Sequence, residues 1–412
     1  MRLRTWYIGH VLGFMALVTG CDPKDPGVTG GTVSEGTTTG GSDSGGTTGG
    51  GGSDSEGTTS AVETTDGPDE TTGGTGEATT ETTSGGHDTD SGSTPDDFAC
   101  EGGAWLFVDP EKSGAGLVSL AADGRARVFS EGLSREFDAA GTLVATVPIP
   151  MGALHWDIDA EGNGYGMFRD EDGVSPRKRL RKFDPEGVML WERDLGPRDQ
   201  GYWWGYDLAI AADGTTVYSD RAAVGDGTRM VKHAADGTPL WDLEVADQLE
   251  VSAIGASGAM VALVWNEGVR LLDPSGEELW TRPWELSVLS TAAIDGAGAV
   301  VVGTEIGSSA VKIGKFAADG TPLWDTIIEG MWGFGDLAVN ASGEIAVGGE
   351  FNNEPPFRGM VARLDPSGAT LATHSCDSGS WEVNVAIGDD GTIFASGAVD
   401  FDAYHLYVTA YE

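Results

Sequence analysis

Tryptophans and acidic residues recur at matching distances ahead of glycine turns, and together they could form a ligand site. Trp204, Trp332 and Trp381 each stand 10 or 11 residues before a turn glycine. Asp207 and Asp336 stand seven residues before theirs. Aromatic faces beside carboxylates can stack on, and hydrogen-bond to, a sugar, a peptide or an amine. We expect the three tryptophans to occupy equivalent places on loops that enter the central channel, and we take these five residues as candidate ligand-binding residues. The alternative is that the rings pack on one another as a cap.

Other chemistry is weakly indicated. Asp207 and Asp336 would suit an acid–base lyase or hydrolase, but no organised set of catalytic residues surrounds them in the sequence. Residues 157–163 resemble a calcium loop with oxygens at alternate positions, although Gly162 is also an ordinary turn glycine and the downstream bidentate acid is missing. No Cys or His cluster has metal-ligand spacing, and no Gly-rich phosphate loop opens a helix. We predict no catalytic residue, no metal and no cofactor, with calcium binding left open.

A repeated unit must position these residues. Seven turn glycines follow one another at intervals of 38 to 52 residues, and each has an aliphatic residue four positions before it. The position five before is mostly small, as an inner strand near a crowded axis requires. The Asp or Ser that accompanies most of these glycines indicates hairpin turns. The seven glycines are Gly124, Gly162, Gly214, Gly258, Gly298, Gly343 and Gly391.

A second hairpin follows each of the first six. Its turn glycine is followed three residues later by an aliphatic residue and, in four copies, by Trp one residue further. Two hairpins make four antiparallel strands, and four strands in about 40–50 residues form one propeller blade. The constant register of Trp191, Trp241, Trp280 and Trp324 predicts that they pack between blades rather than bind a ligand. The second glycines are Gly141, Gly187, Gly237, Gly276, Gly320 and Gly368.

The ring needs a strand from the N-terminal side to close. There are seven first hairpins but only six second hairpins, and the chain stops soon after Gly391. Residues 103–107 match 237–241 in register, which pairs Phe107 with Trp241. We therefore predict an all-β, seven-bladed β-propeller of four-stranded antiparallel blades, closed by an N-terminal strand at residues 104–108.

The repeats also resemble known propeller families. Residues 334–349 and 361–371 are similar to the secreted bacterial seven-bladed β-propeller repeat. The half-repeat in which Asp-Pro-x-Gly or Ala-Asp-Gly precedes Leu-Trp resembles quinoprotein-like (PQQ-like) repeats and the propeller lipoprotein of outer-membrane protein assembly. The resemblance covers residues 104–411 and implies the fold rather than one activity. The chain lacks the vicinal cysteine pair and the cofactor-stacking motif that the resemblance associates with quinone-dependent dehydrogenases.

The N-terminus indicates export. Residues 1–20 combine two arginines with a short apolar run, as a signal peptide does. Residues 17–21 resemble the lipobox of bacterial lipoproteins, which implies lipidation of Cys21; the alternative is an ordinary secretory signal. After lipidation Cys100 and Cys376 would remain, and an oxidising compartment would allow one disulfide between them. Strand directions that place them at opposite ends of adjacent strands would forbid it.

A tether follows the signal. Residues 22–100 contain 20 Gly, 20 Thr and 9 Ser. Such a composition cannot bury enough apolar surface to fold, so we assign residues 21–100 as a disordered tether and residues 101–412 as the propeller. The propeller carries 49 acidic against 21 basic residues, which disfavours nucleic acid as a partner. One basic run, residues 177–182, is either a solvated face or a docking patch.

These observations favour a binding or scaffold protein. We expect a monomer in the bacterial cell envelope, anchored to a membrane by lipid, with a glycan, a peptide or an envelope protein as ligand. The competing hypothesis is a propeller enzyme, either a quinone-cofactor dehydrogenase or an acid–base lyase or hydrolase. Binding is favoured because the sequence offers aromatic residues and isolated acids but no catalytic motif.

Overall fold

The computed structural model describes residues 98–412, except 113, 115, 131, 152, 171–176, 198–206, 222–226, 308, 352–357, 379 and 400–404. The predicted signal peptide, Cys21 and nearly all of the tether lie outside the described residues, as does Trp204.

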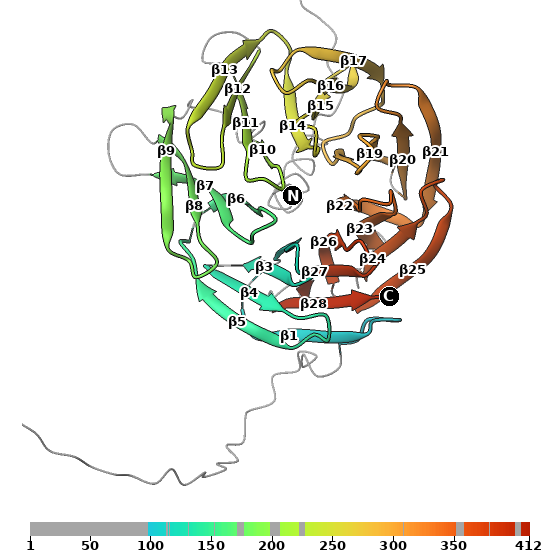
Figure 1. Cartoon of the computed structure of the whole chain (residues 1–412). Helices are drawn as coiled ribbons and strands as arrows, with labels where there is room; N and C mark the ends of the chain where they lie inside the picture. The colour runs from blue at the N-terminus through green and yellow to red at the C-terminus, as the bar shows by residue number, and fades with distance from the viewer. Residues whose placement is uncertain are drawn as a thin grey trace, which may run out of the picture. The chain divides into compact units, whose positions relative to one another are not determined.

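Seven four-stranded antiparallel sheets stand in a ring and form a β-propeller (Figure 1). The described residues contain strands and turns but no helix. Six blades are each built from four consecutive strands, and the seventh takes one strand from the N-terminal side. The predicted fold class is therefore confirmed, including its closure.

Blades 1 to 4 follow one another along the chain. Blade 1 contains β2 (Leu117–Leu120), β3 (Ala126–Ser130), β4 (Leu133–Phe137) and β5 (Leu143–Pro148). Blade 2 contains β6 (Ala153–Ile158), β7 (Gly164–Asp170), β8 (Arg177–Phe183) and β9 (Met189–Pro197). Blade 3 contains β10 (Asp207–Ile210), β11 (Thr216–Arg221), β12 (Thr228–His233) and β13 (Pro239–Val245). Blade 4 contains β14 (Leu249–Ile254), β15 (Met260–Val264), β16 (Gly268–Leu272) and β17 (Glu278–Pro283).

The remaining blades complete the ring. Blade 5 contains β18 (Thr291–Ile294), β19 (Val300–Ile306), β20 (Ala310–Phe316) and β21 (Pro322–Glu329). Blade 6 contains β22 (Met331–Val339), β23 (Ile345–Phe351), β24 (Arg358–Leu364) and β25 (Thr370–Ser378). Blade 7 contains β26 (Ser380–Ile387), β27 (Ile393–Val399), β28 (His405–Tyr411) and the N-terminal β1 (Trp105–Lys112).

All thirteen glycines predicted from the repeats close tight turns of one design. Each has a positive φ, between 78° and 92°, which glycine adopts without strain. In the turn of blade 3, the amide of Gly237 donates to the Ala234 carbonyl at 2.8 Å. An acidic side chain then caps the turn, since the Asp236 carboxylate accepts from the Thr238 amide at 2.8 Å. Part of the acidity of the chain is therefore explained by turn formation.

The outermost strand of each of blades 1 to 6 contains a β-bulge. The register shifts there by one residue, and the extra residue is an aliphatic side chain about half exposed. Bulges on edge strands hinder pairing with other chains. The extra residues are Val144, Leu190, Leu240, Leu279, Leu323 and Leu371.

In blades 2 to 5 a tryptophan directly after the bulged residue links its blade to the following one, and Trp105 on β1 does the same for blade 7. We call this contact a clasp: the indole N–H donates to the carbonyl two residues before the turn glycine of the next blade. The Trp241 indole, for example, donates to the Pro274 carbonyl at 3.0 Å. The structural role predicted for the regular tryptophans is confirmed. The clasps are Trp105 to Ala139, Trp191 to Ala235, Trp241 to Pro274, Trp280 to Ala318 and Trp324 to Pro366.

The closing strand lies where the sequence predicted it, but its predicted register is wrong by two residues. Trp105, not Phe107, takes the place of Trp241, since Trp105 pairs with Ala410 and its indole donates to Ala139 of blade 1. No covalent turn joins β28 to β1, so β1 has no bulged aliphatic residue and reaches its tryptophan two positions earlier.

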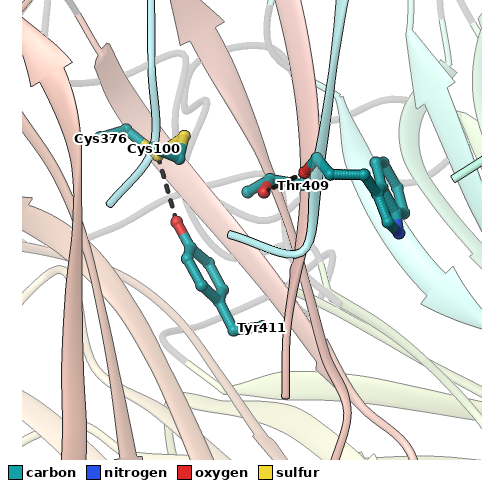
Figure 2. The surroundings of a disulfide bond; sticks show 5 residues. Cys100, Cys376, Thr409 and Tyr411 are labelled. Atoms are coloured by element: carbon teal, nitrogen blue, oxygen red, sulfur yellow. Dashed lines mark hydrogen bonds between the residues drawn. A yellow bond between two sulfur atoms is a disulfide. The ribbon is translucent and has the colours of Figure 1, made fainter. Parts of the chain in front are cut away.

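A disulfide joins Cys100, which precedes the closing strand of blade 7, to Cys376 in the outer strand of blade 6 (Figure 2). The two residues form an isolated antiparallel bridge, so strand direction does not forbid the bond. The Tyr411 hydroxyl donates to the Cys376 sulfur at 3.2 Å, and burial raises the pKa of Tyr411. The segment before the closing strand and the last strand of the propeller, β28, are therefore both linked to blade 6.

Candidate functional site on the connection rim

The two rims of the ring differ in regularity. Because the strands of each blade alternate in direction, all thirteen tight turns lie on one rim, which we call the turn rim. The connections from the second to the third strand and from blade to blade leave the opposite rim, which we call the connection rim. These connections vary in length and include 198–206, which contains Trp204 and is not described. Variable connections on a regular scaffold are where binding residues concentrate.

The structure brings three of the five predicted ligand residues into neighbouring blades. Trp332 and Asp336 lie on β22, and Trp381 lies on β26, the inner strand of the next blade. Asp207 begins β10 in blade 3, away from them. The expectation that these tryptophans lie on loops is wrong for Trp332 and Trp381, because both stand inside strands where the register shifts at a bulge.

The two aspartates hold blades together. Asp336 is buried, and its carboxylate accepts from the Leu337 amide at 2.8 Å and from the Val385 amide of blade 7 at 3.2 Å. Asp207 accepts from the Leu208 amide at 3.1 Å and lies 3.8 Å from the His155 ring of blade 2. The two carboxylates therefore act at different interfaces and do not form a pair.

In blade 7, the residue seven positions before the turn glycine is Asn384, and it also hydrogen-bonds to a neighbouring blade. The Asn384 amide donates to the Gly116 carbonyl at 3.0 Å, and the Ser396 hydroxyl donates to the same carbonyl at 2.7 Å. Gly116 directly precedes the inner strand of blade 1. Polar side chains at this position thus satisfy backbone groups near the axis, where an unpaired buried group would be costly.

Glu305 is a candidate that sequence reasoning missed. It lies on β19 two residues after Gly303, on the face that packs toward blade 6, where the ring of Phe334 covers Gly303. Burial raises the pKa of Glu305 to about 7. Beside the strand that carries Trp332, this carboxyl could accept a ligand hydroxyl or amine. No repeat pattern identifies it, because the residue type at the equivalent position is not constant across the blades.

Replacing Glu305 with Gln should give a pH-dependent gain in stability. A carboxyl whose folded pKa is raised above its ordinary value of 4.5 stabilises the fold at low pH and loses that contribution as pH rises through about 7. We expect Glu305→Gln to match wild type at pH 4.5 and, because solvent screens this partly exposed carboxyl, to be more stable by only about 1–2 kcal/mol at pH 8. Urea unfolding at both pH values measures this. An equal difference at the two pH values would contradict the assignment.

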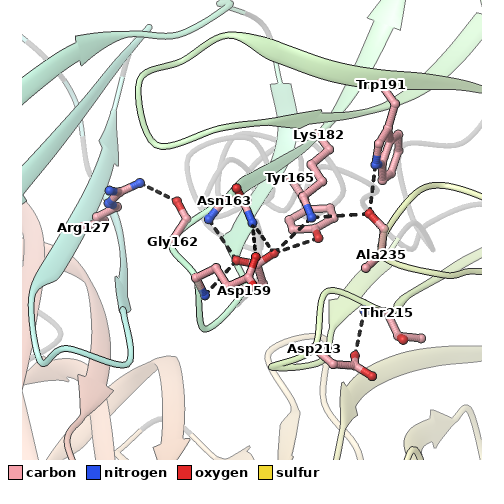
Figure 3. Close-up of polar contacts among 11 residues, drawn as sticks. Arg127, Asp159, Gly162, Asn163, Tyr165, Lys182, Trp191, Asp213, Thr215 and Ala235 are labelled. Atoms are coloured by element: carbon pink, nitrogen blue, oxygen red, sulfur yellow. Dashed lines mark hydrogen bonds and ion pairs between the residues drawn. The ribbon is translucent and has the colours of Figure 1, made fainter.

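The calcium-like loop is an ordinary capped turn (Figure 3). One oxygen of Asp159 accepts from the amides of Glu161 and Asn163, and the other accepts from the Tyr165 hydroxyl at 2.9 Å. The Lys182 ammonium lies 3.3 Å from Asp159, and burial raises the pKa of Tyr165. Across the described part of the chain, no three His, Cys, Asp or Glu side chains gather as a metal site.

The basic run is paired rather than available for docking. Arg177, Lys178, Arg179, Arg181 and Lys182 all lie on β8 and form ion pairs. The arginines face carboxylates of the neighbouring strand β9, at 2.6 Å from Arg177 to Asp194 and 2.7 Å from Arg181 to Glu192. The run is thus neutralised within the propeller.

Comparisons with known proteins agree on fold alone. No protein-family model and no curated protein matches the chain. A chain in the crystal structure of the mitotic checkpoint complex aligns with a TM-score of 0.53 at 12% identity, over 81% of this chain and 99% of that one. The Dos1 propeller aligns with a TM-score of 0.45 at 10% identity, over 72% and 78%. A protein of unknown function from Bacteroides caccae gives 0.39 at 13%, over 63% and 93%.

This protein therefore belongs by fold to the seven-bladed β-propellers. At such low identity the likeness supports no activity or partner. Within the described residues, no helix has the length and apolar character that crossing a membrane requires.

Proposed function

We propose that this chain is an exported, lipid-anchored bacterial β-propeller that binds a ligand at its connection rim and is not an enzyme. The observation that carries the proposal is the contrast between the rims. Thirteen turns of one design form one rim, whereas the irregular connections and the unmatched aromatic residues fall on the other. A uniform rim serves folding, and a variable rim is free to acquire a ligand.

The ligand is a glycan, a peptide or a protein of the cell envelope. Trp332 is partly exposed at the start of β22, and an indole ring can stack on a ligand. Glu305, on the neighbouring blade, adds a carboxyl that is largely ionised only above about pH 7. An aromatic residue and a carboxyl on neighbouring strands fit a hydroxyl-rich or amine-bearing ligand. Ligand binding to this pair is therefore expected to change with pH between 6 and 8.

Glycan and peptide arrays probed with the purified propeller test the binding proposal. We expect one ligand class to bind and Trp332→Ala to abolish that binding. Trp241→Ala is the matched control, because it removes a clasp on the turn rim and, since Trp241 is partly buried, costs less than the about 3–5 kcal/mol of a fully buried tryptophan. Retained binding by a folded Trp332→Ala variant, or no ligand on either array, would reject the rim as a binding site.

The anchor is tested by Cys21→Ser. The apolar signal, the residues before Cys21 and the polar segment after it support lipidation, and more than one acyl chain would make anchoring stable. We expect the variant to move from the membrane fraction to the soluble exported fraction, and labelled fatty acid to be incorporated by wild type only. Membrane association of both proteins without label would exclude the lipoprotein assignment.

A further inference from the structure

The clasps show what kind of side chain the turn rim accepts between blades. In blade 2, the Trp191 indole donates to the Ala235 carbonyl at 3.0 Å, and Arg193 donates to the Gly237 carbonyl at 2.5 Å. In blade 4, Arg282 repeats this with the Gly320 carbonyl at 2.6 Å. Each arginine also lies over the ring of its own tryptophan. The complete clasp is therefore a tryptophan followed two residues later by an arginine.

The turn that receives each complete clasp carries an acid just before its glycine. Asp236 precedes Gly237, and Asp319 precedes Gly320. Backbone hydrogen bonds from Thr238 and Thr321 are the main causes that lower the pKa of these carboxyls, and the clasp arginines Arg193 and Arg282 contribute. Charge thus matches between the arginine of one blade and the turn of the next.

Blades 6 and 7 are joined without a clasp. Ala372 stands where the tryptophan would be, but the disulfide between Cys100 and Cys376 links the two blades. The His374 ring also stacks on Tyr411, with ring centroids 4.4 Å apart. This interface is therefore filled by other means.

Between blades 1 and 2, the described residues contain neither a clasp nor a disulfide. Ala145 stands at the tryptophan position and Val147 at the arginine position. Val147 covers Gly187, but the Pro185 carbonyl accepts no hydrogen bond from any residue that the structure describes. Glu186 occupies the place of Asp236 and Asp319 and is exposed. The carbonyl and the acidic turn residue that accept a clasp are therefore present here, but the tryptophan and arginine that would donate to them are missing.

Apolar side chains gather at the same place. Leu143 and Val144 on β5 are 40% and 47% exposed, and Val188, Met189 and Leu190 next to the receiving turn are 60%, 53% and 52% exposed. Blades 3 to 6 each expose the bulged aliphatic residue of the outer strand with fewer apolar neighbours among the described residues. An apolar ring placed between the two strands would cover this surface.

We propose that this surface binds an extended segment of a partner protein that carries a tryptophan and, two residues later, an arginine. The indole N–H donates to the Pro185 carbonyl while the ring packs on Val144 and Val188. The arginine pairs with Glu186. The clasps of blades 2 and 4 supply the template for these contacts, and the acidic turn supplies the charge complementarity. The site lies on the turn rim and is independent of the ligand proposed above.

A peptide copying residues 189–195 tests the proposal, because it contains the tryptophan and arginine of the blade 2 clasp in their natural spacing. We expect saturable binding to the full propeller by fluorescence anisotropy. Peptides with Trp191→Ala or Arg193→Gln should bind about tenfold more weakly or not at all. Raised salt should weaken binding of the wild-type peptide, because part of the contact is ionic.

Propeller variants locate the site. Ala145→Trp combined with Val147→Arg supplies the missing half in cis and should abolish peptide binding while raising the melting temperature. Glu186→Gln should weaken binding about tenfold, whereas Asp319→Asn, at a turn already clasped by Arg282, should not. Binding that survives the double variant overturns the proposal. The proposal is also overturned if no peptide binds and the double variant instead abolishes self-association of the propeller or its binding to anionic vesicles.

Discussion

A variant lacking residues 100–110 is expected to remain soluble but to unfold at a much lower temperature than wild type. The deletion removes most of β1, and with it the outer strand of blade 7. Trp105 and Phe107 pack into the apolar core between blades 7 and 1, and Leu106 and Val108 pack beside Cys376. These four side chains are partly buried, so each contributes less than the about 1.5–3 kcal/mol of a fully buried one, but their summed loss is still a large fraction of the stability of a domain.

The contribution of the strand can be separated from that of its disulfide. The bridge spans 276 residues of sequence, and in the chain-entropy account a loop of that length contributes about 5 kcal/mol. The double variant Cys100→Ser and Cys376→Ser removes only this part. Thermal and urea unfolding should therefore rank wild type above the double variant, and the double variant above the deletion. An unchanged melting temperature after deletion would refute the closure.

Local chemistry made much of this fold predictable. Every tight turn has a glycine with positive φ, and most have an aspartate that caps the turn, so Asp-Gly and Asp-Pro-x-Gly recur at many of the hairpins. The regular tryptophans recur because the same carbonyl lies at the same place in each following turn. Both patterns depend on residues close in sequence or on an exact repeat, and these can be read without coordinates.

The register of the closing strand depended on something the sequence does not contain. Elsewhere a covalent turn fixes how many residues separate the glycine from the tryptophan, and a bulge adds one. Between β28 and β1 there is no such turn, so Trp105 pairs directly with Ala410. Counting from Gly103 by analogy therefore placed Phe107 where Trp105 lies.

The candidate site was only partly predictable for a related reason. The spacing of Asp336 from its glycine identified a position near the axis, but not that the Val385 amide of the next blade would occupy its carboxylate. Bulges in β22 and β26 kept Trp332 and Trp381 within strands. Glu305 became visible only once the packing of blade 5 on blade 6 was known.

Blades 2 and 3 are joined by an unusually polar interface. The Lys178 ammonium pairs with Asp220, and both side chains are almost completely buried. Tyr218 lies beneath the same ammonium, with 5.5 Å between the nitrogen and the ring centroid. The interfaces formed by blades 3, 4 and 5 are instead filled mainly with Val, Leu, Met and Phe. A buried ion pair of this kind fixes how two blades meet rather than adding net stability.

Lys178→Met is expected to destabilise the propeller by about 3–5 kcal/mol, because Asp220 would be left buried without its partner charge. Adding Asp220→Leu should restore most of that loss, since two apolar side chains of similar size need no compensating charge. Asp325→Asn is the control: it breaks an exposed pair with Lys312 and should cost about 0–1 kcal/mol. Urea unfolding of the four proteins measures the coupling. If Lys178→Met costs no more than Asp325→Asn, or if the double variant is as unstable as the single one, Lys178 and Asp220 do not stabilise one another across the blades.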